Sequence, residues 1–276
     1  MNKDLEQKLA DLKCYLKNLE SVAIAFSGGV DSTFLVAVAK EVLPSNKLLV
    51  LTAISDFFPL REMDEAKEFC ANRKINHIIV PIDILHNDAV VKNPANRCYL
   101  CKSAIFTQLK KIALDKGFEH IVEGSNLDDM GDYRPGLQAL NEQNIKSPLR
   151  DCNLSKQDIR DISKEMGLPT WDKPSFACLA SRFVYGETIT KEKLMMIDKA
   201  EQLLLNLGFR QFRVRIHGNL ARIEILPEDF AKIMVDDIRQ KINNEFTEMG
   251  FAYTTLDLKG YRTGSMNETL KKTRTI

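Results

Sequence analysis

Cysteine side chains are the first candidates for chemistry in this chain. Six cysteines are present, and Cys98 and Cys101 form a C-x-x-C pair at the expected start of a helix. A thiol pair in that position suits metal binding or redox work. A third thiol, Cys178, precedes Ser181 and Arg182, polar neighbours that favour a reactive thiol over a buried apolar one. Three cysteines can hold a 4Fe-4S cluster with one iron left open, or contribute to a zinc site.

A glycine-rich loop follows the first expected strand. It consists of Ser27, Gly28, Gly29, Val30, Asp31 and Ser32. The two glycines allow backbone angles that are closed to other residues, so the main chain can approach a ligand closely. The serine hydroxyls and the amides at the start of the next helix face an anion, with the positive end of the helix dipole behind them. The loop lacks the Gly-Lys-Ser/Thr ending of a Walker P-loop, yet it predicts a phosphate site.

Polar residues also follow the second and fourth expected strands. Gly124, Asp129 and Arg134 lie after the fourth strand. Carboxylates would repel a polyphosphate unless a magnesium ion (Mg2+) bridged the two. The guanidinium of Arg134 is suited to bind a phosphate group through two hydrogen bonds. The alternative interpretation is an acidic loop exposed to solvent. Ser55, after the second strand, either contacts an adenine or ribose or caps the following helix.

Arginines gather in the C-terminal part of the sequence. Arg213 and Arg215 alternate with a valine, which places both on one face of a strand. With Arg182 and Arg262 they predict a clamp for phosphate and carboxylate groups. A solvated strand face is the alternative interpretation.

Three further charged residues are candidates for the catalytic site. Glu201 and Glu224 could orient a sulfur site or bind a metal, although ordinary surface charge explains either one equally well. Lys102 directly follows the second cysteine of the C-x-x-C pair and is placed to screen a developing anion.

The elements that must position these residues alternate along the first half of the chain. Buried strands are expected at Val22–Phe26, Lys47–Ala53, His77–Asp83 and His120–Gly124, and helices at Asp31–Leu43, Leu60–Arg73 and Cys101–Lys116. An amphipathic helix, with leucines at 5, 9, 12, 16 and 19, precedes them. This alternation predicts an α/β fold with a doubly wound parallel sheet, in which ligands bind at the carboxyl ends of the strands.

Two prolines, Pro169 and Pro174, indicate a domain boundary. We therefore expect an N-terminal domain over residues 1–174 and a smaller α+β domain over residues 175–276. The smaller domain is predicted to hold helices near Thr190–Leu207 and Glu228–Met249 and strands near Gln211–His217, Leu220–Leu226 and Phe251–Leu258.

Composition narrows the class of protein. With 44% hydrophobic and 28% charged residues, disorder and a disulfide scaffold are excluded. A formal net charge of +1 provides no overall positive potential that would attract nucleic acid. No run approaches the roughly 18 apolar residues of a membrane span, and the N-terminus lacks the apolar core of a secretory signal, so a cytoplasmic protein without a membrane partner is expected.

The loop from Ser27 to Ser32 resembles the PP-loop of the ATP pyrophosphatases, which cleave ATP to AMP and pyrophosphate. The resemblance implies that Ser27, Gly28, Gly29, Asp31 and Ser32 hold the β- and γ-phosphates of ATP. It also implies that Asp31 helps to place Mg2+. Cleavage of ATP in this way serves to adenylate an acceptor.

The segments 171–182, 213–218 and 256–268 narrow the resemblance to the LarE family, and this resemblance covers nearly the whole chain. LarE proteins are ATP-dependent sulfur transferases that build the nickel-pincer cofactor of lactate racemase. They adenylate a carboxylate of pyridinium-3,5-biscarboxylic acid mononucleotide and convert it to a thiocarboxylate, and two passes give the dithio product. The resemblance implies a small-molecule nucleotide substrate and a homo-oligomer, with a sulfide donor as a candidate partner.

Two versions of this family differ in the source of sulfur. In one, a cysteine that matches Cys178 gives up its sulfur and becomes dehydroalanine; in the other, three cysteines hold an iron–sulfur cluster. Because Cys98 and Cys101 accompany Cys178, the sequence favours a 4Fe-4S cluster, with a sacrificial Cys178 as the main rival. A tRNA-thiolating enzyme is a further alternative, against which the near-neutral charge counts. A non-catalytic nucleotide sensor is another, and it would bind ATP without releasing pyrophosphate.

Overall fold

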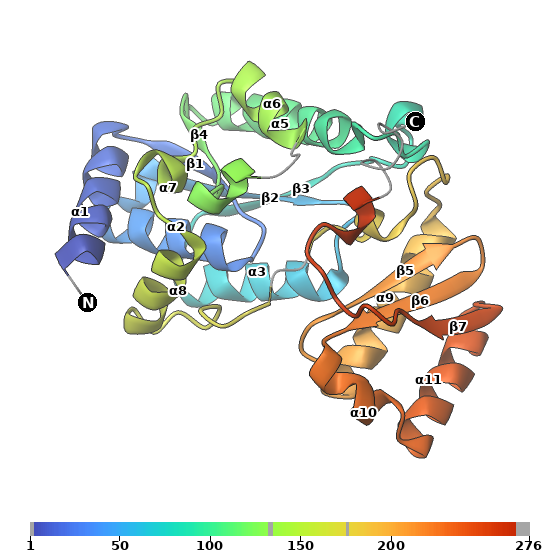
Figure 1. The fold of residues 1–276 in the computed structure, drawn as a ribbon. Coiled ribbons are helices and arrows are strands. Elements are labelled where there is room, and N and C mark those ends of the chain that lie inside the picture. The colour runs from blue at the N-terminus through green and yellow to red at the C-terminus, as the bar shows by residue number, and fades with distance from the viewer. Residues whose placement is uncertain (1–2, 132–134, 175–176, 269–276) are drawn as a thin grey trace. The chain divides into compact units, whose positions relative to one another are not determined.

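A parallel β-sheet organises the N-terminal part of the chain in the computed structural model, which describes residues 3–131, 135–174 and 177–268 (Figure 1). Its strands are β1 (Val22–Ala25), β2 (Leu48–Ile54), β3 (His77–Pro81) and β4 (Ile121–Val122). They pair in the order β3-β2-β1-β4, and every pair is parallel. Near-continuous Val, Ile and Leu content suits strands that are covered on both faces. The predicted α/β fold with a parallel sheet is confirmed.

Helices cover both faces of this sheet. In Figure 1, α2 (Val30–Val42) and α3 (Leu60–Asn72) lie on one face, and α5 (Arg97–Asp115) and α6 (Pro135–Glu142) on the other. The remaining N-terminal helices are α1 (Lys3–Asn18), α4 (Asp88–Val91), α7 (Pro148–Asp151) and α8 (Lys156–Glu165), with 3₁₀ turns at Ser45–Lys47 and Leu127–Gly131. The loops at the carboxyl ends of the strands are thereby held at one edge of a rigid layer.

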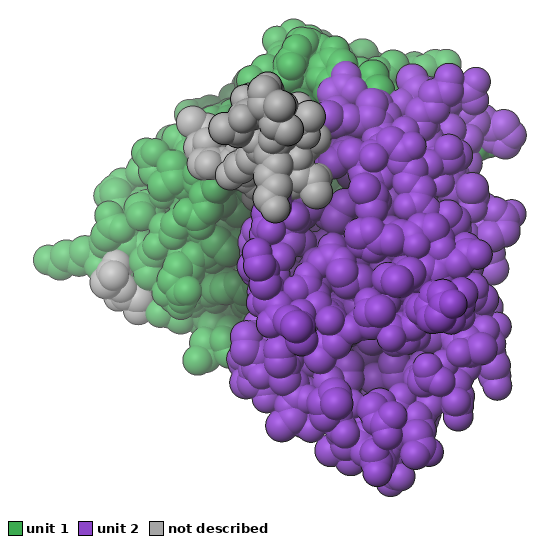
Figure 2. Space-filling view, turned by 45° about the vertical axis from the view of Figure 1, so that its right-hand side comes forward, with its two compact units in different colours: residues 1–83, 98–176 green, residues 84–97, 177–276 purple. Residues whose placement is uncertain are grey.

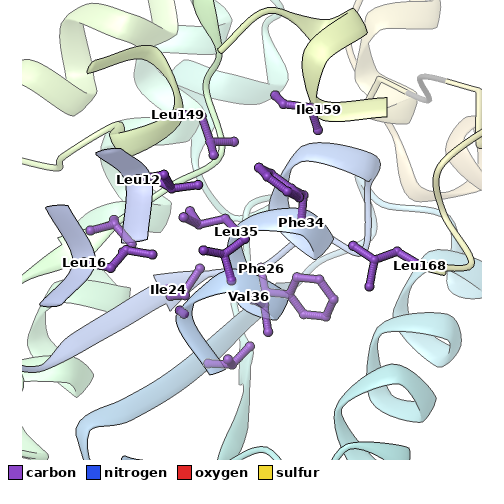
Figure 3. Packing of buried hydrophobic residues seen from close by; sticks show 14 of the residues in the cluster. Leu12, Leu16, Ile24, Phe26, Phe34, Leu35, Val36, Leu149, Ile159 and Leu168 are labelled. Carbon is purple, nitrogen blue, oxygen red and sulfur yellow. The ribbon is translucent and has the colours of Figure 1, made fainter. Parts of the chain in front are cut away.

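A hydrophobic core cluster lies around α2. This helix is apolar on nearly every side, as expected of a helix buried between the sheet and further helices. Figure 3 shows Phe34 and Leu35 of α2 beside Leu12 and Leu16 of α1, all of which belong to one buried cluster. The predicted amphipathic first helix therefore packs on the body of the protein. This packing fixes the helix whose first turn carries the candidate phosphate loop.

The chain divides into two units, coloured separately in Figure 2. The first comprises residues 1–83 and 98–176, and the second residues 84–97 and 177–276. The single boundary predicted after residue 174 does not account for the segment 84–97. Hydrogen bonds explain its assignment, because Ile189 N donates to Val91 O (2.8 Å) and Gly186 N donates to Asn93 O (2.9 Å).

The second unit is an α+β structure around a three-stranded sheet. It contains α9 (Lys191–Asn206), β5 (Phe212–His217), β6 (Leu220–Ile225), α10 (Phe230–Ile233), α11 (Asp236–Glu248) and β7 (Tyr253–Leu256), with 3₁₀ turns at Leu179–Arg182, Pro227–Asp229 and Ser265–Asn267. The strand order is β5-β6-β7; β5 and β6 are antiparallel, and β7 runs parallel to β6.

One expected helix of this unit is interrupted. The sequence predicts a single helix near Glu228–Met249, but the helical pattern breaks at Met234 and Val235, and α11 starts afresh at Asp236. Two aspartates, Asp236 and Asp237, occupy the first turn of α11, where carboxylates stabilise the positive end of a helix dipole.

Across the described ranges, the structure contains no helix with the length and apolar character needed to cross a membrane.

Candidate functional site

The glycine-rich loop joins the carboxyl end of β1 to α2. Gly28 has a φ of 73°, in the left-handed region, and a Cβ added there would lie 3.2 Å from the carbonyl oxygen of Glu62 and 3.4 Å from the Cβ of Ala66. Both the backbone angle and the close approach of α3 therefore require glycine. Gly29 has an ordinary φ of −78° and precedes the first turn of α2.

The two serines of the loop are bonded to each other and to the main chain. Ser27 N donates to Ser32 Oγ (3.3 Å), Ser32 Oγ donates to Gly29 O (3.2 Å), and the two hydroxyl oxygens lie 3.2 Å apart. The side chain of Val30 is buried in the core, so only its main chain can face a ligand. Because the first amides of a helix have no partner within it, the start of α2 is suited to an anion.

Asp31 connects this loop with the loop after β4. Its Oδ2 accepts from Lys156 Nζ at 2.5 Å, and its Oδ1 accepts from Asn126 Nδ2 at 3.2 Å. A Cβ on Gly124 would lie only 3.0 Å from Ser32 N, so this glycine lets the two loops meet. Asp129 belongs to the same group, because its Oδ2 accepts from Asn126 N at 3.0 Å. Arg134 lies outside the described residues.

Several residues at this edge of the sheet were missed by the sequence analysis. They are Asn126, Lys156 and Lys173. Lys173 Nζ donates to Gly28 O (3.2 Å), Glu62 Oε2 (2.7 Å) and Glu65 Oε2 (2.5 Å). The only sequence signal for Lys173 was its place between Trp171 and Pro174, inside a segment that the LarE resemblance singles out.

Ser55 and Lys102, two of the predicted site residues, make contacts within their own surroundings. Ser55 Oγ accepts from Phe57 N at 3.2 Å, and α3 begins only after Pro59, so Ser55 shapes the turn after β2 and does not cap α3. Lys102 lies along α5, where its stem fills the space left by Gly136; a Cβ on that glycine would come within 2.8 Å of Lys102 Cδ.

The three candidate sulfur ligands lie on two segments. Cys98 and Cys101 are half-buried in the first turns of α5, three residues apart and thus on one face of the helix. Cys178 is half-buried directly before the 3₁₀ turn Leu179–Arg182. All six cysteines are described, and none is half of a disulfide. Thiols at this spacing fit two ligands of an iron–sulfur cluster. Within the described residues, no group of three or more His, Cys, Asp or Glu side chains is arranged to hold a metal ion.

A fully buried arginine anchors the Cys178 segment. Arg182 Nη1 donates to the carbonyl oxygens of Ala177 (2.5 Å) and Cys178 (3.0 Å) and to Ser181 Oγ (2.9 Å). Its Nε and Nη2 hold both oxygens of Glu201, at 2.8 and 2.7 Å, and both side chains are 0% exposed. Burial disfavours either charge, but their mutual attraction outweighs it, so the pKa of Glu201 is lowered and that of Arg182 is raised.

A second buried ion pair joins β5 to β6. Arg215 Nη2 donates to Glu224 Oε2 and to Ser265 Oγ, both at 2.9 Å, while its Nη1 donates to the carbonyl oxygen of Ser181 at 2.8 Å. Its Nε is buried without a hydrogen-bond acceptor. Glu201 and Glu224 are therefore partners of buried arginines, and neither is an ordinary surface charge.

The other two arginines of the predicted clamp differ in burial. Arg213 is buried beneath the ring of Tyr261, 5.2 Å from its centroid. Burial, and then the neighbouring charge of Arg182, lower its pKa to about 10. Arg262 is more exposed; it donates to Glu268 Oε1 (2.9 Å) and Gly260 O (2.8 Å). Hydrogen bonds thus join Cys178 and Ser181 to Arg182 and Arg215. Arg213 lies on the same strand as Arg215, and Arg262 is the more exposed member of the predicted clamp.

A parallel sheet whose first strand leads through a Gly-Gly-Val-Asp-Ser loop into a buried helix defines a nucleotide-binding domain of the PP-loop class. The PP-loop domain family matches residues 1–133, which carry this loop.

Whole-length relatives extend the match to the second unit. An uncharacterised protein of Synechocystis is 42% identical over 97% of this chain and all of its own length. The pyridinium-3,5-bisthiocarboxylic acid mononucleotide synthase of Lactiplantibacillus plantarum is 35% identical over 97% of this chain and 96% of its own length. An uncharacterised protein of Methanocaldococcus jannaschii is 34% identical over 93% of this chain and 98% of its own length. The chain belongs to the LarE family of ATP-dependent sulfurtransferases, within the PP-loop ATP pyrophosphatases.

Proposed function

We propose that this enzyme converts pyridinium-3,5-biscarboxylic acid mononucleotide to its thiocarboxylates, as a step in building a nickel-pincer cofactor. One observation carries the proposal: the similarity to the Lactiplantibacillus synthase spans 97% of the chain, so it includes the PP-loop and also the Cys178 segment with its arginines. The PP-loop would bind ATP. In the second unit, the arginines would bind an anionic acceptor, and Cys178 would take part in sulfur delivery.

The first half-reaction is adenylation. A carboxylate oxygen of the substrate attacks the α-phosphorus of ATP, an oxygen–phosphorus bond forms, and the bond to the β-phosphate breaks with its electron pair leaving on pyrophosphate. Ser27, Ser32 and the first amides of α2 are proposed to hold the β- and γ-phosphates. The poor leaving oxygen of the carboxylate thereby becomes part of AMP, which leaves readily.

Mg2+ would accompany the polyphosphate and offset its charge. Asp31 and Asp129 have suitable oxygen donors and lie in connected loops. Asp31 is paired with Lys156, so we expect this lysine to release the carboxylate, or to share it, when nucleotide binds. Ser55 and Arg134 stay predicted contacts of the nucleotide.

The second half-reaction is sulfur transfer. A sulfur nucleophile attacks the acyl carbon, a carbon–sulfur bond forms, and AMP departs. We propose that Cys98, Cys101 and Cys178 hold a 4Fe-4S cluster, whose open iron would carry an exchangeable sulfide for this attack. Lys102, next to the second thiol, is proposed to screen the charge that develops on the acyl oxygen.

The anionic substrate needs cations in its pocket. Arg213 and Arg215 supply them from one strand face, and the buried Nε of Arg215 still has a hydrogen to donate. We assign Ser181 and Arg182 to the same pocket and Arg262 to its margin. Glu201 and Glu224 are proposed to orient these arginines, because each accepts from one of them at 2.9 Å or less.

The test begins with iron and acid-labile sulfide measured in anaerobically purified protein. About four irons per chain are expected, with loss of the cluster in Cys98→Ala and retention in Cys14→Ala, a matched change at an exposed cysteine. Protein, ATP, Mg2+, sulfide and the biscarboxylic mononucleotide should then yield pyrophosphate and a product in which sulfur replaces oxygen.

Other outcomes would change the proposal. Iron-free protein that loses the elements of hydrogen sulfide from Cys178 during the reaction would replace the cluster with sacrifice of that cysteine. ATP binding without any pyrophosphate release would support a nucleotide sensor instead. Thiolation of a tRNA, with no turnover of the mononucleotide, would point to the RNA-modifying relatives. Homo-oligomer formation and the identity of a sulfide donor stay predictions.

A further inference from the structure

The main chain around Cys178 is held by arginine side chains. Arg182 donates to the carbonyl oxygens of Ala177 and Cys178, and Arg215 donates to that of Ser181. A third guanidinium completes the set, because Arg97 Nη1 donates to the carbonyl oxygen of Ala180 at 2.7 Å. The first two arginines belong to the predicted clamp, but Arg97 was assigned no role by the sequence or by the proposed function.

Arg97 occupies an unfavourable place for a cation. It is the first residue of α5 and only 3% exposed. Burial disfavours its charge, and the N-terminal end of a helix dipole repels it. Its Nη1 donates to Asn93 Oδ1 (2.6 Å) and to Ala180 O, and so joins the side chain of Asn93 to the main chain near Cys178.

Asn93 fixes the orientation of the Arg97 side chain. It is fully buried, has a φ of 52°, and uses every polar atom. Its N donates to Val90 O (3.0 Å), its O accepts from Gly186 N (2.9 Å), and its Nδ2 donates to Val184 O (2.7 Å), which leaves Oδ1 to orient Arg97. Asparagine tolerates this left-handed backbone better than most residues. The segment 84–97 thus holds the chain from Ala180 to Gly186 at several points.

We propose that Arg97, oriented by Asn93, is a positioning residue that fixes the main chain two residues beyond Cys178 and so aims the sulfur of that segment at the adenylated carboxylate. The inference rests on the proposed function only in assigning sulfur delivery to Cys178. It holds whether the cysteine ligates a cluster or gives up its own sulfur, because both chemistries need its Sγ at a fixed place.

The test separates the two half-reactions in Arg97→Met, Arg97→Lys and the control Arg210→Met, which removes an exposed arginine of the same unit. Pyrophosphate release reports adenylation, and thiocarboxylate formation reports transfer. Iodoacetamide labelling of Cys178 and Cys98, followed by mass spectrometry of peptides, reports the local structure without any substrate.

Arg97→Met should lower transfer on the order of 10²-fold, the cost typical of a misplaced reacting group, while pyrophosphate release stays unchanged. Its Cys178 should be labelled faster than in the unaltered protein, since the released segment opens more often. Arg97→Lys keeps the charge without the planar fork and should be intermediate. Arg210→Met should match the unaltered protein in all three measurements.

The proposal would be overturned if Arg97→Met formed thiocarboxylate and was labelled at Cys178 at the same rates as the unaltered protein. It would also be overturned if the rates of pyrophosphate release and thiocarboxylate formation fell by the same factor. If Arg97→Met does not fold, by circular dichroism, the same comparison is made on Arg97→Lys. If even the unaltered protein forms no thiocarboxylate, the proposed function fails, and the labelling rates alone decide whether Arg97 positions Cys178.

Discussion

Gly28 and Gly29 are neighbours in the phosphate loop, yet their backbones make different demands. Gly28 has a left-handed φ, and the carbonyl oxygen of Glu62 would lie 3.2 Å from a Cβ at this position, which is closer than most Cβ contacts. A Cβ on Gly29 would meet only Ser27 Oγ, at an ordinary 3.5 Å. The residue type alone does not distinguish the two positions.

We expect Gly28→Ala to lower the free energy of unfolding by about 1–2 kcal/mol, the usual cost of a left-handed backbone for a residue with a Cβ. Gly29→Ala should change it little, because a slightly poorer helix cap is offset by the reduced freedom of the unfolded chain. Urea denaturation of both variants measures the difference. Equal destabilisation would show that the turn does not depend on the backbone of Gly28.

Local spacing predicted the candidate site where its residues are close in sequence. The loop from Ser27 to Ser32 and the strand pair Arg213 and Arg215 were both identified from a few adjacent residues. The partners Lys156 and Lys173 were not, because they lie 125 and 145 residues from Asp31 and Gly28. Such pairing is created by the packing of α8 and of the segment after it, and no spacing in the sequence encodes it.

At the scale of elements, the strands were predicted well because buried parallel strands are continuous apolar runs. The helix expected near Glu228–Met249 was less accurate, since an exposed break at Met234 and Val235 costs little and leaves the helical periodicity almost intact. The topology of a parallel sheet predicts that the loops after its strands lie at one edge. It does not predict which side chains of those loops contact one another.

The segment between α8 and the end of the first unit braces the phosphate loop. Arg160 of α8 holds its main chain by donating to Trp171 O (2.6 Å) and Lys173 O (2.7 Å). The Lys173 side chain then reaches Gly28 and two glutamates of α3. The loop is thereby held in one shape before nucleotide arrives, which lowers the entropy lost on binding.

Lys173→Met should therefore raise KM for ATP about tenfold, the equivalent of 1.4 kcal/mol, with a smaller effect on kcat. Lys173→Arg should recover part of the loss. The matched control is Lys164→Met, because Lys164 lies over the Trp171 ring, 4.8 Å from its centroid, and has no bond to the loop. Pyrophosphate release at varied ATP concentration measures both constants. An unchanged KM in Lys173→Met would contradict the bracing role.

For the whole molecule, the division into units does not follow the order of the chain. Residues 84–97 belong with residues 177–276, although the chain returns to the first unit between them. No pattern in the sequence indicated this, because the segment 84–97 contains only the short α4, and its single proline and its polar residues are typical of a loop. Its assignment depends on hydrogen bonds to residues about 90 positions away, such as that from Asn93 to Val184.

We therefore expect a fragment of residues 175–276 to be incomplete. Without residues 84–97, the amides of Gly186 and Ile189 lose their acceptors, Asn93 O and Val91 O, and should exchange with deuterium much faster than in the full chain. The amide of Val214 is the internal control, since it donates to Glu201 within the fragment at 3.0 Å and should stay protected. Adding a peptide of residues 84–97 should restore protection at Gly186 and Ile189. Slow exchange at both amides without the peptide would show that the second unit needs no contribution from residues 84–97.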